Sequence, residues 1–276
     1  MSWGYYVDNS FEPYDGYYRG SQWTYDNNNT GVANSFSGSL LMQQRTGLPL
    51  WNAYTSQAVR RTNPRYTSVD TDVEELIAAG VHVCIAAGNR NLPIDVDGGP
   101  DYNNRYRVNP YGTPGGYIYY CRGSSPFSTN AFMVGSVDDV VNSTGNLEQR
   151  ASYSNSGPGV DIYAPGDNII STMSTTNEGA DGDYPSDANF KIGSKSGTSM
   201  ASPQVAGILA TILEARPTYT QTECLNWLNE VGELNRLYDP TTGTPSTDYN
   251  NYRALQGAKN LYLKTPFVNT KPYSVS

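Results

Sequence analysis

Residues 70–87 read DTDVEELIAAGVHVCIAA, and this stretch decides the fold class. Val73, Leu76 and Ile77 recur at the spacing of one helical face, which predicts a helix that ends just before the next segment. Residues 81–87 form a continuous apolar run rich in β-branched residues, which is typical of a strand covered on both faces of a parallel sheet. A helix followed by a buried strand predicts an α/β fold with a mainly parallel sheet, in which residues 81–87 form a central strand.

Flanking residues extend this prediction in both directions. Thr71 and Glu74 have the spacing of a capping box, so we expect the helix to begin near Thr71. Residues 132–137, FMVGSV, predict a further short strand, and residues 159–166, GVDIYAPG, predict a strand closed by a turn. The chain is thus expected to be a single domain over residues 1–276.

Composition excludes several classes of function. The chain has 276 residues, of which 37% are hydrophobic, enough for a sizeable core. Lys and Arg number 18 against 26 Asp and Glu, and the net charge of −8 would repel both nucleic acid and an anionic membrane surface. No apolar run approaches the ~18 residues that span a bilayer. The start, MSWGYY, lacks the basic and apolar regions of a secretory signal, so the sequence assigns no compartment.

Cysteines and acidic residues give little support for a metal site. Cys84, Cys121 and Cys224 are odd in number and dispersed, which fits neither a disulfide framework nor paired zinc ligands. Residues 95–101, DVDGGPD, place three carboxylates around glycines and could hold calcium, but they do not match a spaced calcium loop. We favour a solvated acidic loop and expect no cofactor, with calcium as the one open candidate.

Two polar stretches interrupt the predicted elements, at about residues 5–66 and 90–128. The first carries turn residues every few positions, which predicts mostly irregular structure. Six tyrosines precede residue 26. They could form a binding platform, but we favour a loop layer on the domain in which each ring is buried and each hydroxyl stays in water. We interpret both stretches as insertions.

Residues 196–207, SGTSMASPQVAG, place Ser199 at the start of a helix that runs through Glu214. A serine there is most often an N-cap, but backbone N–H groups and the helix dipole also favour negative charge beside it, as a developing oxyanion requires. Small residues along this helix would let it pass close to neighbouring backbone, so we expect it to be buried in the middle of the domain. They are Ala201, Ala206, Gly207 and Ala210.

The string GTSMASP at 197–203, followed by VAG at 205–207, resembles the nucleophile motif of the subtilisin-like serine peptidases. Residues 80–89, ending in AAGN, are similar to the strand that ends in the family's oxyanion-hole asparagine. The stretch that begins at Ser152 resembles the family's Ser-aromatic-Ser-Asn segment, and Gln204 stands where the family commonly has a histidine that supports the helix. Residues 217–221 resemble the start of its penultimate helix.

This resemblance implies roles for individual residues. Ser199 would be the catalytic nucleophile and Asn89 the oxyanion donor, acting on a polypeptide substrate. Substrate would pair with two strands, one of which is the N-terminal SWG, which resembles the family's substrate strand. The implied substrate-binding residues are Ser2, Trp3, Gly4, Ala86, Ala87 and Gly88.

The family's base and its orienting aspartate have no counterpart in these residues. A serine hydroxyl needs a base to become a good nucleophile near neutral pH. The one histidine, His82, lies inside the predicted strand and lacks the family's His-Gly-Thr-His context, so we interpret it as a core residue. In the family the aspartate and histidine precede the substrate strand, so both would lie upstream of Met1, together with the first strands of the sheet. A sheet cut there exposes an edge that needs covering.

Two functions therefore stay open. In the first, the chain is the C-terminal part of a serine endopeptidase, active when an upstream segment or partner chain supplies the aspartate and histidine, and inactive alone. Alternatively, the fold serves as an inactive structural or binding module, for example in an extracellular or virion assembly. A simple truncation would look the same. Retention of both Ser199 and Asn89 favours the enzyme, because a structural copy needs neither.

Overall fold

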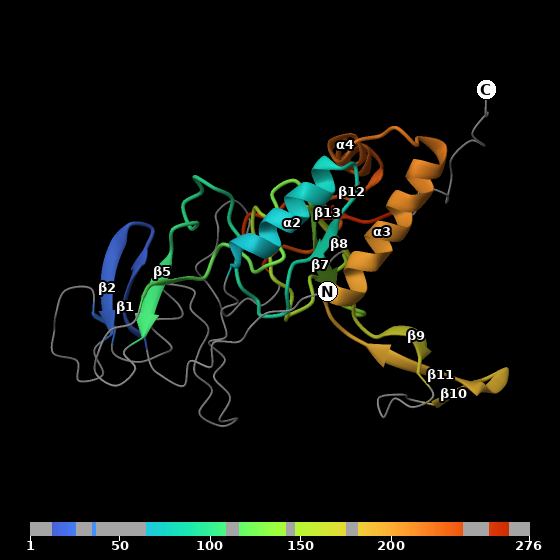
Figure 1. Cartoon of the computed structure of the whole chain (residues 1–276). Coiled ribbons are helices and arrows are strands. Elements are labelled where there is room, and N and C mark those ends of the chain that lie inside the picture. The colour runs from blue at the N-terminus through green and yellow to red at the C-terminus, as the bar shows by residue number, and fades with distance from the viewer. Residues whose placement is uncertain are drawn as a thin grey trace.

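A mainly parallel sheet lies at the centre of the molecule, with strand order β12-β13-β8-β7-β4 (Figure 1). The computed structural model describes residues 13–25, 35–36, 65–108, 116–141, 147–174, 182–239 and 254–264. Within these ranges β4, β7, β8 and β13 pair in parallel, and β12 joins antiparallel to β13. The strands are β4 (Cys84–Ala86), β7 (Phe132–Val137), β8 (Ile162–Pro165), β12 (Glu233–Leu234) and β13 (Leu261–Tyr262).

Helices cover both faces of this sheet. On one face, Met133 of β7 packs in a core with Val73 of α2 (Thr67–Ala78). On the other face, Phe132 and Val134 of the same strand pack with Leu209 of α3 (Thr198–Ala215) and with α4 (Gln221–Val231). Alternate side chains of one strand thus enter two cores, as a strand buried on both faces requires. The predicted α/β fold is confirmed. No helix within the described ranges has both the length and the apolarity to cross a bilayer.

The prediction that residues 81–87 form a central strand is wrong for the described part of the chain. β4 pairs with β7 alone and ends the strand order. Two backbone hydrogen bonds extend the pairing of β4 with β7 beyond the ends of β4. Phe132 N–H donates to the Val83 carbonyl and Ala87 N–H to the Val134 carbonyl (both 2.9 Å). Ile85 is buried, whereas its neighbours in β4 are half-buried. A short apolar run indicates covered faces but does not reveal whether both edges are paired.

The helix α3 is buried along one side only, not throughout as expected. Its larger side chains Val205, Leu209 and Ile212 fill the core and Ala201 is fully buried. Of the small residues expected to face neighbouring backbone, Ala206, Gly207 and Ala210 are exposed. A methyl group added at Gly207 would meet no atom within 4 Å of it among the described residues. The small residues therefore form an outer face of this helix.

The helix α2 begins at Thr67, earlier than the predicted Thr71. The Thr71 hydroxyl donates to the Thr67 carbonyl (2.8 Å), so Thr71 lies inside the helix and does not cap it. Asp70 fixes the first turn instead, because its carboxylate accepts hydrogen bonds from the Ser125 hydroxyl (2.7 Å) and from Phe127 N–H (2.9 Å). A contact with a distant segment has overridden the local capping pattern.

Parts of the two polar stretches pair with each other in a second sheet, of order β3-β2-β1-β5-β6. β1 and β2 form an antiparallel hairpin, and β1 also pairs antiparallel with β5, so that Gly16 lies opposite Tyr106. A methyl group at Gly16 would lie 2.4 Å from the Arg105 carbonyl oxygen, which explains the glycine. The described part of the first stretch is therefore strand, not irregular. The strands are β1 (Pro13–Tyr18), β2 (Ser21–Tyr25), β3 (Ser35–Phe36), β5 (Arg105–Val108) and β6 (Ile118–Tyr119).

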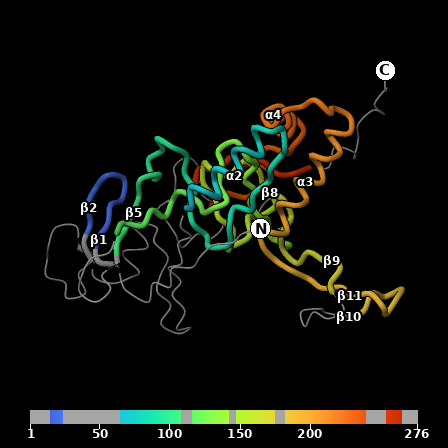
Figure 2. Tube along the Cα trace, viewed as in Figure 1, coloured from blue at the N-terminus to red at the C-terminus, as the bar shows by residue number. Residues whose placement is uncertain are grey.

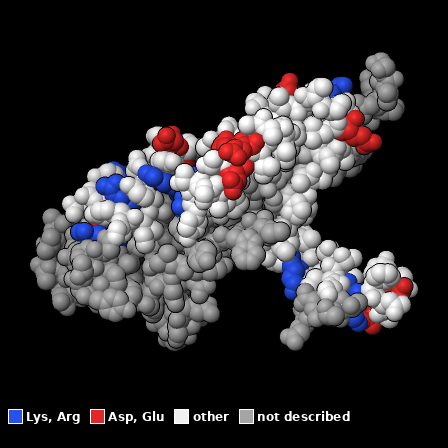
Figure 3. All heavy atoms as spheres, in the orientation of Figure 1, with Lys and Arg blue, Asp and Glu red and all other residues white. Residues whose placement is uncertain are grey.

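Arginines stack on the tyrosines of this second sheet. The Arg105 guanidinium lies 4.4 Å from the ring centre of Tyr17 and 4.9 Å from that of Tyr117. Arg107 forms a two-pronged ion pair with the buried Asp15, with both N–O distances 2.6 Å. Figure 3 shows the basic groups gathered over this part of the molecule and acidic groups over α2. The tyrosines described here belong to a packed sheet and not to the loop layer that we favoured.

A third, antiparallel sheet, β10-β11-β9, projects from the end of the molecule at which α3 begins (Figures 1 and 2). It comprises β9 (Ile169–Met173), β10 (Gly182–Tyr184) and β11 (Asp187–Lys195). Apolar side chains on it are open to solvent, with Ile170 71% and Phe190 58% exposed. β11 leads directly into the turn before Ser199, so the projection and the candidate nucleophile share one connection.

Asp161, just before β8, should make stability depend on pH. Burial raises the pKa of this carboxyl from 3.8 to about 6, although it accepts a hydrogen bond from Met133 N–H (2.7 Å). As pH rises from about 4 to 6 the unfolded chain loses this proton first, so the free energy of unfolding falls. Asp161→Asn keeps the acceptor and removes the charge. We expect it to match the wild type in urea denaturation at pH 4 and to exceed it at pH 7. A pH-independent difference would contradict the assignment.

Candidate active site

Ser199 lies at the start of α3, as predicted, and is exposed. The residue before the helix is Gly197, whose N–H donates to the Gly166 carbonyl (2.8 Å) while its own carbonyl accepts from Met200 N–H (2.9 Å). These bonds tie the turn to the end of β8 and close the first turn of the helix. Ser199 is therefore presented to solvent on a backbone that is held from both sides.

Asn89 follows the end of β4, and its side chain is bonded to the residue next to Ser199. Its Oδ1 accepts hydrogen bonds from both the backbone N–H (2.9 Å) and the hydroxyl (2.8 Å) of Thr198. The Thr198 hydroxyl in turn accepts from Gly88 N–H (3.0 Å). Thr198 is 1% exposed, so these bonds form away from solvent. The structure thus brings the candidate oxyanion residue and the nucleophile turn together.

The two bonds to Oδ1 also orient the Asn89 amide. Because the oxygen faces Thr198, the NH₂ group on the same carbon points away from Thr198 as a donor. A methyl group added at Gly197 would lie 2.9 Å from Nδ2, so this turn approaches the amide closely and has no room for a side chain. A fixed N–H donor beside a helix N-terminus that carries an exposed serine can stabilise negative charge on an atom attacked by that serine.

The candidate substrate residues divide into two groups. Ser2, Trp3 and Gly4 lie outside the described residues. The backbone carbonyls of Ala87 and Gly88 accept hydrogen bonds from Asn155, from its side-chain amide to Ala87 (2.7 Å) and from its backbone N–H to Gly88 (2.8 Å). Ala86 is half-buried in β4. Substrate pairing with these residues stays a prediction.

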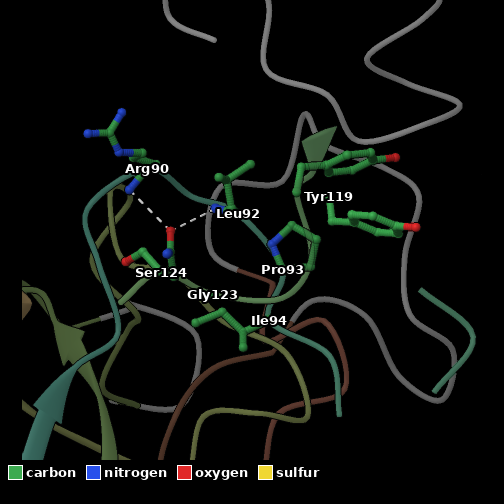
Figure 4. Close-up of a pocket in the computed structure, with 9 residues that line it drawn as sticks. Arg90, Leu92, Pro93, Ile94, Tyr119, Gly123 and Ser124 are labelled. Carbon is green, nitrogen blue, oxygen red and sulfur yellow. Dashed lines mark hydrogen bonds between the residues drawn. The ribbon is translucent and has the colours of Figure 1, made fainter. Parts of the chain in front are cut away.

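Residues that follow Asn89 in the chain line a pocket (Figure 4). Its lining comes from three segments of the chain, namely Arg90 with Leu92, Pro93 and Ile94, then Tyr119, Tyr120, Gly123 and Ser124, and finally Asn155. Its labelled lining residues in Figure 4 include Arg90, Leu92 and Tyr119. The second polar stretch therefore borders the loop that carries the candidate oxyanion residue.

His82 lies before the first residue of β4, whereas Asn89 follows the last. The length of the strand thus separates the imidazole from the site. His82 is half-buried, and its Nδ1 is buried with no hydrogen-bond partner in the described part of the chain. This placement fits the prediction of a packing residue and gives no route from its imidazole to Ser199.

Gln204 links α3 to the end of β8. Its Nε2 donates to the Pro165 carbonyl (2.5 Å) and lies within reach of the Met200 carbonyl (3.3 Å). Both contacts hold the helix and neither reaches Ser199. The expectation that this position supports the helix, in place of the family's histidine, agrees with the geometry.

The acidic loop at 95–101 does not have the geometry of a calcium site. Asp95 is 2% exposed, and its carboxylate accepts hydrogen bonds from Val96 N–H (2.9 Å) and Asp101 N–H (2.7 Å). Asp101 forms an ion pair with Arg19 (2.8 Å). Asp95 closes the loop and Asp101 joins it to the hairpin. Asp97 is exposed, as are Val96, Gly98 and Pro100, which agrees with the solvated loop that we favoured. Elsewhere in the described ranges, Asp138, Asp139 and Asp167 bring carboxylate oxygens within 4.8 Å of one another.

Sequence reasoning missed three residues that shape this site. Thr198 appears in the sequence only as part of the motif at 197–203, yet it holds the Asn89 amide. Tyr153 and Asn155 were noted only as part of a family-like segment. The Tyr153 hydroxyl donates to the Gly166 carbonyl (3.0 Å), next to the nucleophile turn. No spacing in the sequence marks these contacts, because each joins segments distant in the chain.

Comparison with known proteins identifies the family of this chain. The model of the subtilase family matches residues 7–247. Serine protease AprX of Bacillus subtilis (strain 168) is 34% identical over 157 residues, which cover 55% of this chain and 30% of that protein. A subtilisin-like protease of Coccidioides posadasii is 31% identical over 180 residues, covering 64% of this chain and 33% of that protein. The chain spans about a third of the length of these curated relatives.

A solved structure, that of a cold-adapted subtilisin-like serine proteinase, aligns with 74% of this chain and 52% of its own. The two chains are 23% identical in this alignment, with a TM-score of 0.47.

Proposed function

The chain belongs to the subtilase family, and we propose that it supplies the nucleophile, Ser199, and the oxyanion donor, Asn89, of a serine endopeptidase. The observation that carries this proposal is the double hydrogen bond from Thr198 to Asn89 Oδ1, which fixes an amide donor beside the exposed serine. An oxyanion hole needs such a donor in place before the reaction begins. The substrate class is a polypeptide.

We propose further that the base and its orienting carboxylate come from a segment outside these 276 residues or from a partner chain. His82 is the single histidine of the sequence and lies at the far end of β4 from Asn89. Two surfaces support a covering segment: β4 is the last strand of the described sheet, and the neighbouring helix α3 exposes a face of small residues. That face consists of Ala206, Gly207 and Ala210.

Hydrolysis would then follow the steps of acyl transfer. The supplied imidazole takes the Ser199 proton as the hydroxyl oxygen attacks the peptide carbonyl carbon. Asn89 Nδ2 donates to the oxygen that becomes negative. The imidazolium then gives its proton to the leaving amine, and the C–N bond breaks. Water, activated by the same imidazole, hydrolyses the acyl-serine and restores the hydroxyl.

The second candidate function is an inactive structural or binding module, which the position of His82 favours.

Reconstitution distinguishes the endopeptidase from the inactive module. The chain is mixed with a polypeptide that carries the aspartate and a His-Gly-Thr-His segment, assembly is verified by size-exclusion chromatography, and cleavage of a fluorogenic peptide is followed. We expect hydrolysis by the assembly and none by the assembly made with Ser199→Ala. A verified assembly that hydrolyses nothing would favour the inactive module.

A further inference from the structure

We propose that Tyr153 and Asn155 are positioning residues, which together hold the turn that carries Ser199 and the loop that carries Asn89 in one fixed arrangement. The two residues belong to a single short segment between β7 and β8. The effect that we expect on catalysis rests on the proposed function. The contacts from which we infer the positioning role lie within this chain.

Asn155 clamps the loop that carries Asn89. Its side-chain NH₂ donates to the Ala87 carbonyl (2.7 Å), and its Oδ1 accepts from Arg90 N–H (3.2 Å) and Leu92 N–H (2.9 Å). The last two bonds are the dashed lines in Figure 4. One side chain, 7% exposed, thus bonds to backbone on both sides of Asn89 and fixes the curvature of the loop.

Gly88 permits this clamp. Its φ is +106°, a backbone conformation that residues with a side chain rarely adopt. A methyl group at this position would also lie 2.6 Å from Asn155 Nδ2. The backbone N–H of Asn155 also donates to the Gly88 carbonyl (2.8 Å). The clamp therefore touches the residue directly before Asn89, and Gly88 N–H continues the connection to the Thr198 hydroxyl.

Tyr153 holds the other half of the site. Its hydroxyl donates to the Gly166 carbonyl (3.0 Å) and lies 3.1 Å from the Ser136 hydroxyl oxygen. The same Gly166 carbonyl accepts from Gly197 N–H (2.8 Å), in the turn before Ser199. Tyr153 and the nucleophile turn thus share one acceptor, which sets where that turn meets the end of β8.

The segment that carries both residues is itself anchored by Arg150. This arginine is fully buried, and its guanidinium donates to the carbonyls of Ala254 (2.9 Å) and Ser154 and to Asn91 Oδ1 (2.7 Å). Asn91 N–H returns a bond to the Tyr153 carbonyl (2.7 Å). Because Arg150 fixes this segment, Tyr153 and Asn155 hold the Ser199 turn and the Asn89 loop in a constant position relative to each other.

The first test measures the isolated chain by NMR, so it does not depend on activity. In Asn155→Ala we expect amide exchange of Arg90 and Leu92 to rise by about tenfold, because each loses its acceptor. In Tyr153→Phe we expect the Gly197 and Thr198 amide resonances to move. Both variants should shift the side-chain NH₂ resonances of Asn89. Tyr184→Phe, on the exposed β10, is the matched control and should change none of them.

The second test measures kinetics in the reconstituted assembly. Displacing a catalytic group by about 1 Å costs up to about 100-fold, so we expect Asn155→Ala to lower kcat by that order with little change in KM. The milder Tyr153→Phe, which keeps the ring, should lower kcat less. Unmoved Asn89 resonances in a folded Tyr153→Phe chain, or an unchanged kcat in either variant, would overturn the inference. If the wild-type assembly is inactive, the proposed function fails, and the Asn89 resonances alone decide this inference.

Discussion

A serine-directed fluorophosphonate probe will leave Ser199 of the isolated chain unlabelled. The hydroxyl is exposed, so access does not limit the reaction. His82, the single histidine, lies beyond the far end of β4, so no imidazole reaches Ser199 in the described part of the chain. Loss of the base of a catalytic triad costs about 10⁶-fold in kcat. The oxyanion donor alone retains only weak catalysis over water. Intact-mass spectrometry after incubation with the probe should show the unmodified chain.

The same probe should label Ser199 once a segment that carries the aspartate and histidine is bound. Ser199→Ala in that assembly is the control for the site of labelling, and Ser202→Ala tests that the nearby buried serine contributes nothing. Labelling of the isolated chain that Ser199→Ala abolishes would mean that some group of this chain acts as the base. Labelling that survives Ser199→Ala would place the reactive hydroxyl elsewhere.

The sequence best predicts the elements whose apolar residues pack against the central sheet. β7 matches its predicted bounds, and α3 ends one residue after the predicted Glu214. In both, the apolar pattern is produced by packing against the sheet that the residues themselves help to form. The edge position of β4 was missed for the same reason, because side-chain pattern reports on the faces of a strand and not on its hydrogen-bonding edges.

The second sheet could not be predicted, because its pairing joins distant segments. Gly16 lies opposite Tyr106 in strands that come from different polar stretches. Turn residues and tyrosines in each stretch suggest loops when each is considered alone. Each stretch supplies partners for the polar side chains of the other. Arg105 stacks on Tyr17, and Arg107 forms an ion pair with Asp15.

In the candidate site, too, residues within one motif could be predicted, whereas contacts between distant segments could not. Ser199 and Asn89 could be proposed from the sequence because each belongs to a compact motif that resembles a known family. Thr198 was visible in that motif, but its bonds to Asn89 appear only when β4 and α3 are brought together. Asn155 acts on backbone groups, which every residue carries, so no residue type at positions 87, 90 or 92 indicates that it is needed.

Asn89→Ala should lower kcat of the reconstituted assembly by roughly 100- to 1000-fold, the loss expected when one side-chain donor of an oxyanion hole is removed. Substrate binding in the ground state does not use this donor fully, so KM should change little. The fold should stay intact, since Asn89 is exposed and Gly88 N–H retains its bond to the Thr198 hydroxyl. Initial rates over a range of peptide concentrations, with urea denaturation of each variant, provide the measurement.

Two further variants separate the donor from its orientation. Thr198→Val removes the hydroxyl, and with it the bond to Asn89 Oδ1 and the acceptor of Gly88 N–H, but keeps the backbone bond to Oδ1. We therefore expect a smaller loss of kcat than in Asn89→Ala. Asn89→Asp keeps the size and the acceptor but replaces the NH₂ group with a carboxylate oxygen, which would repel the oxyanion, so its loss should be at least as large as that of alanine. We also expect Asn89 Nδ2 within several ångströms of Ser199 Oγ in a crystal structure. Full activity in Asn89→Asp would rule out the amide as the oxyanion donor, because a carboxylate has no N–H to give.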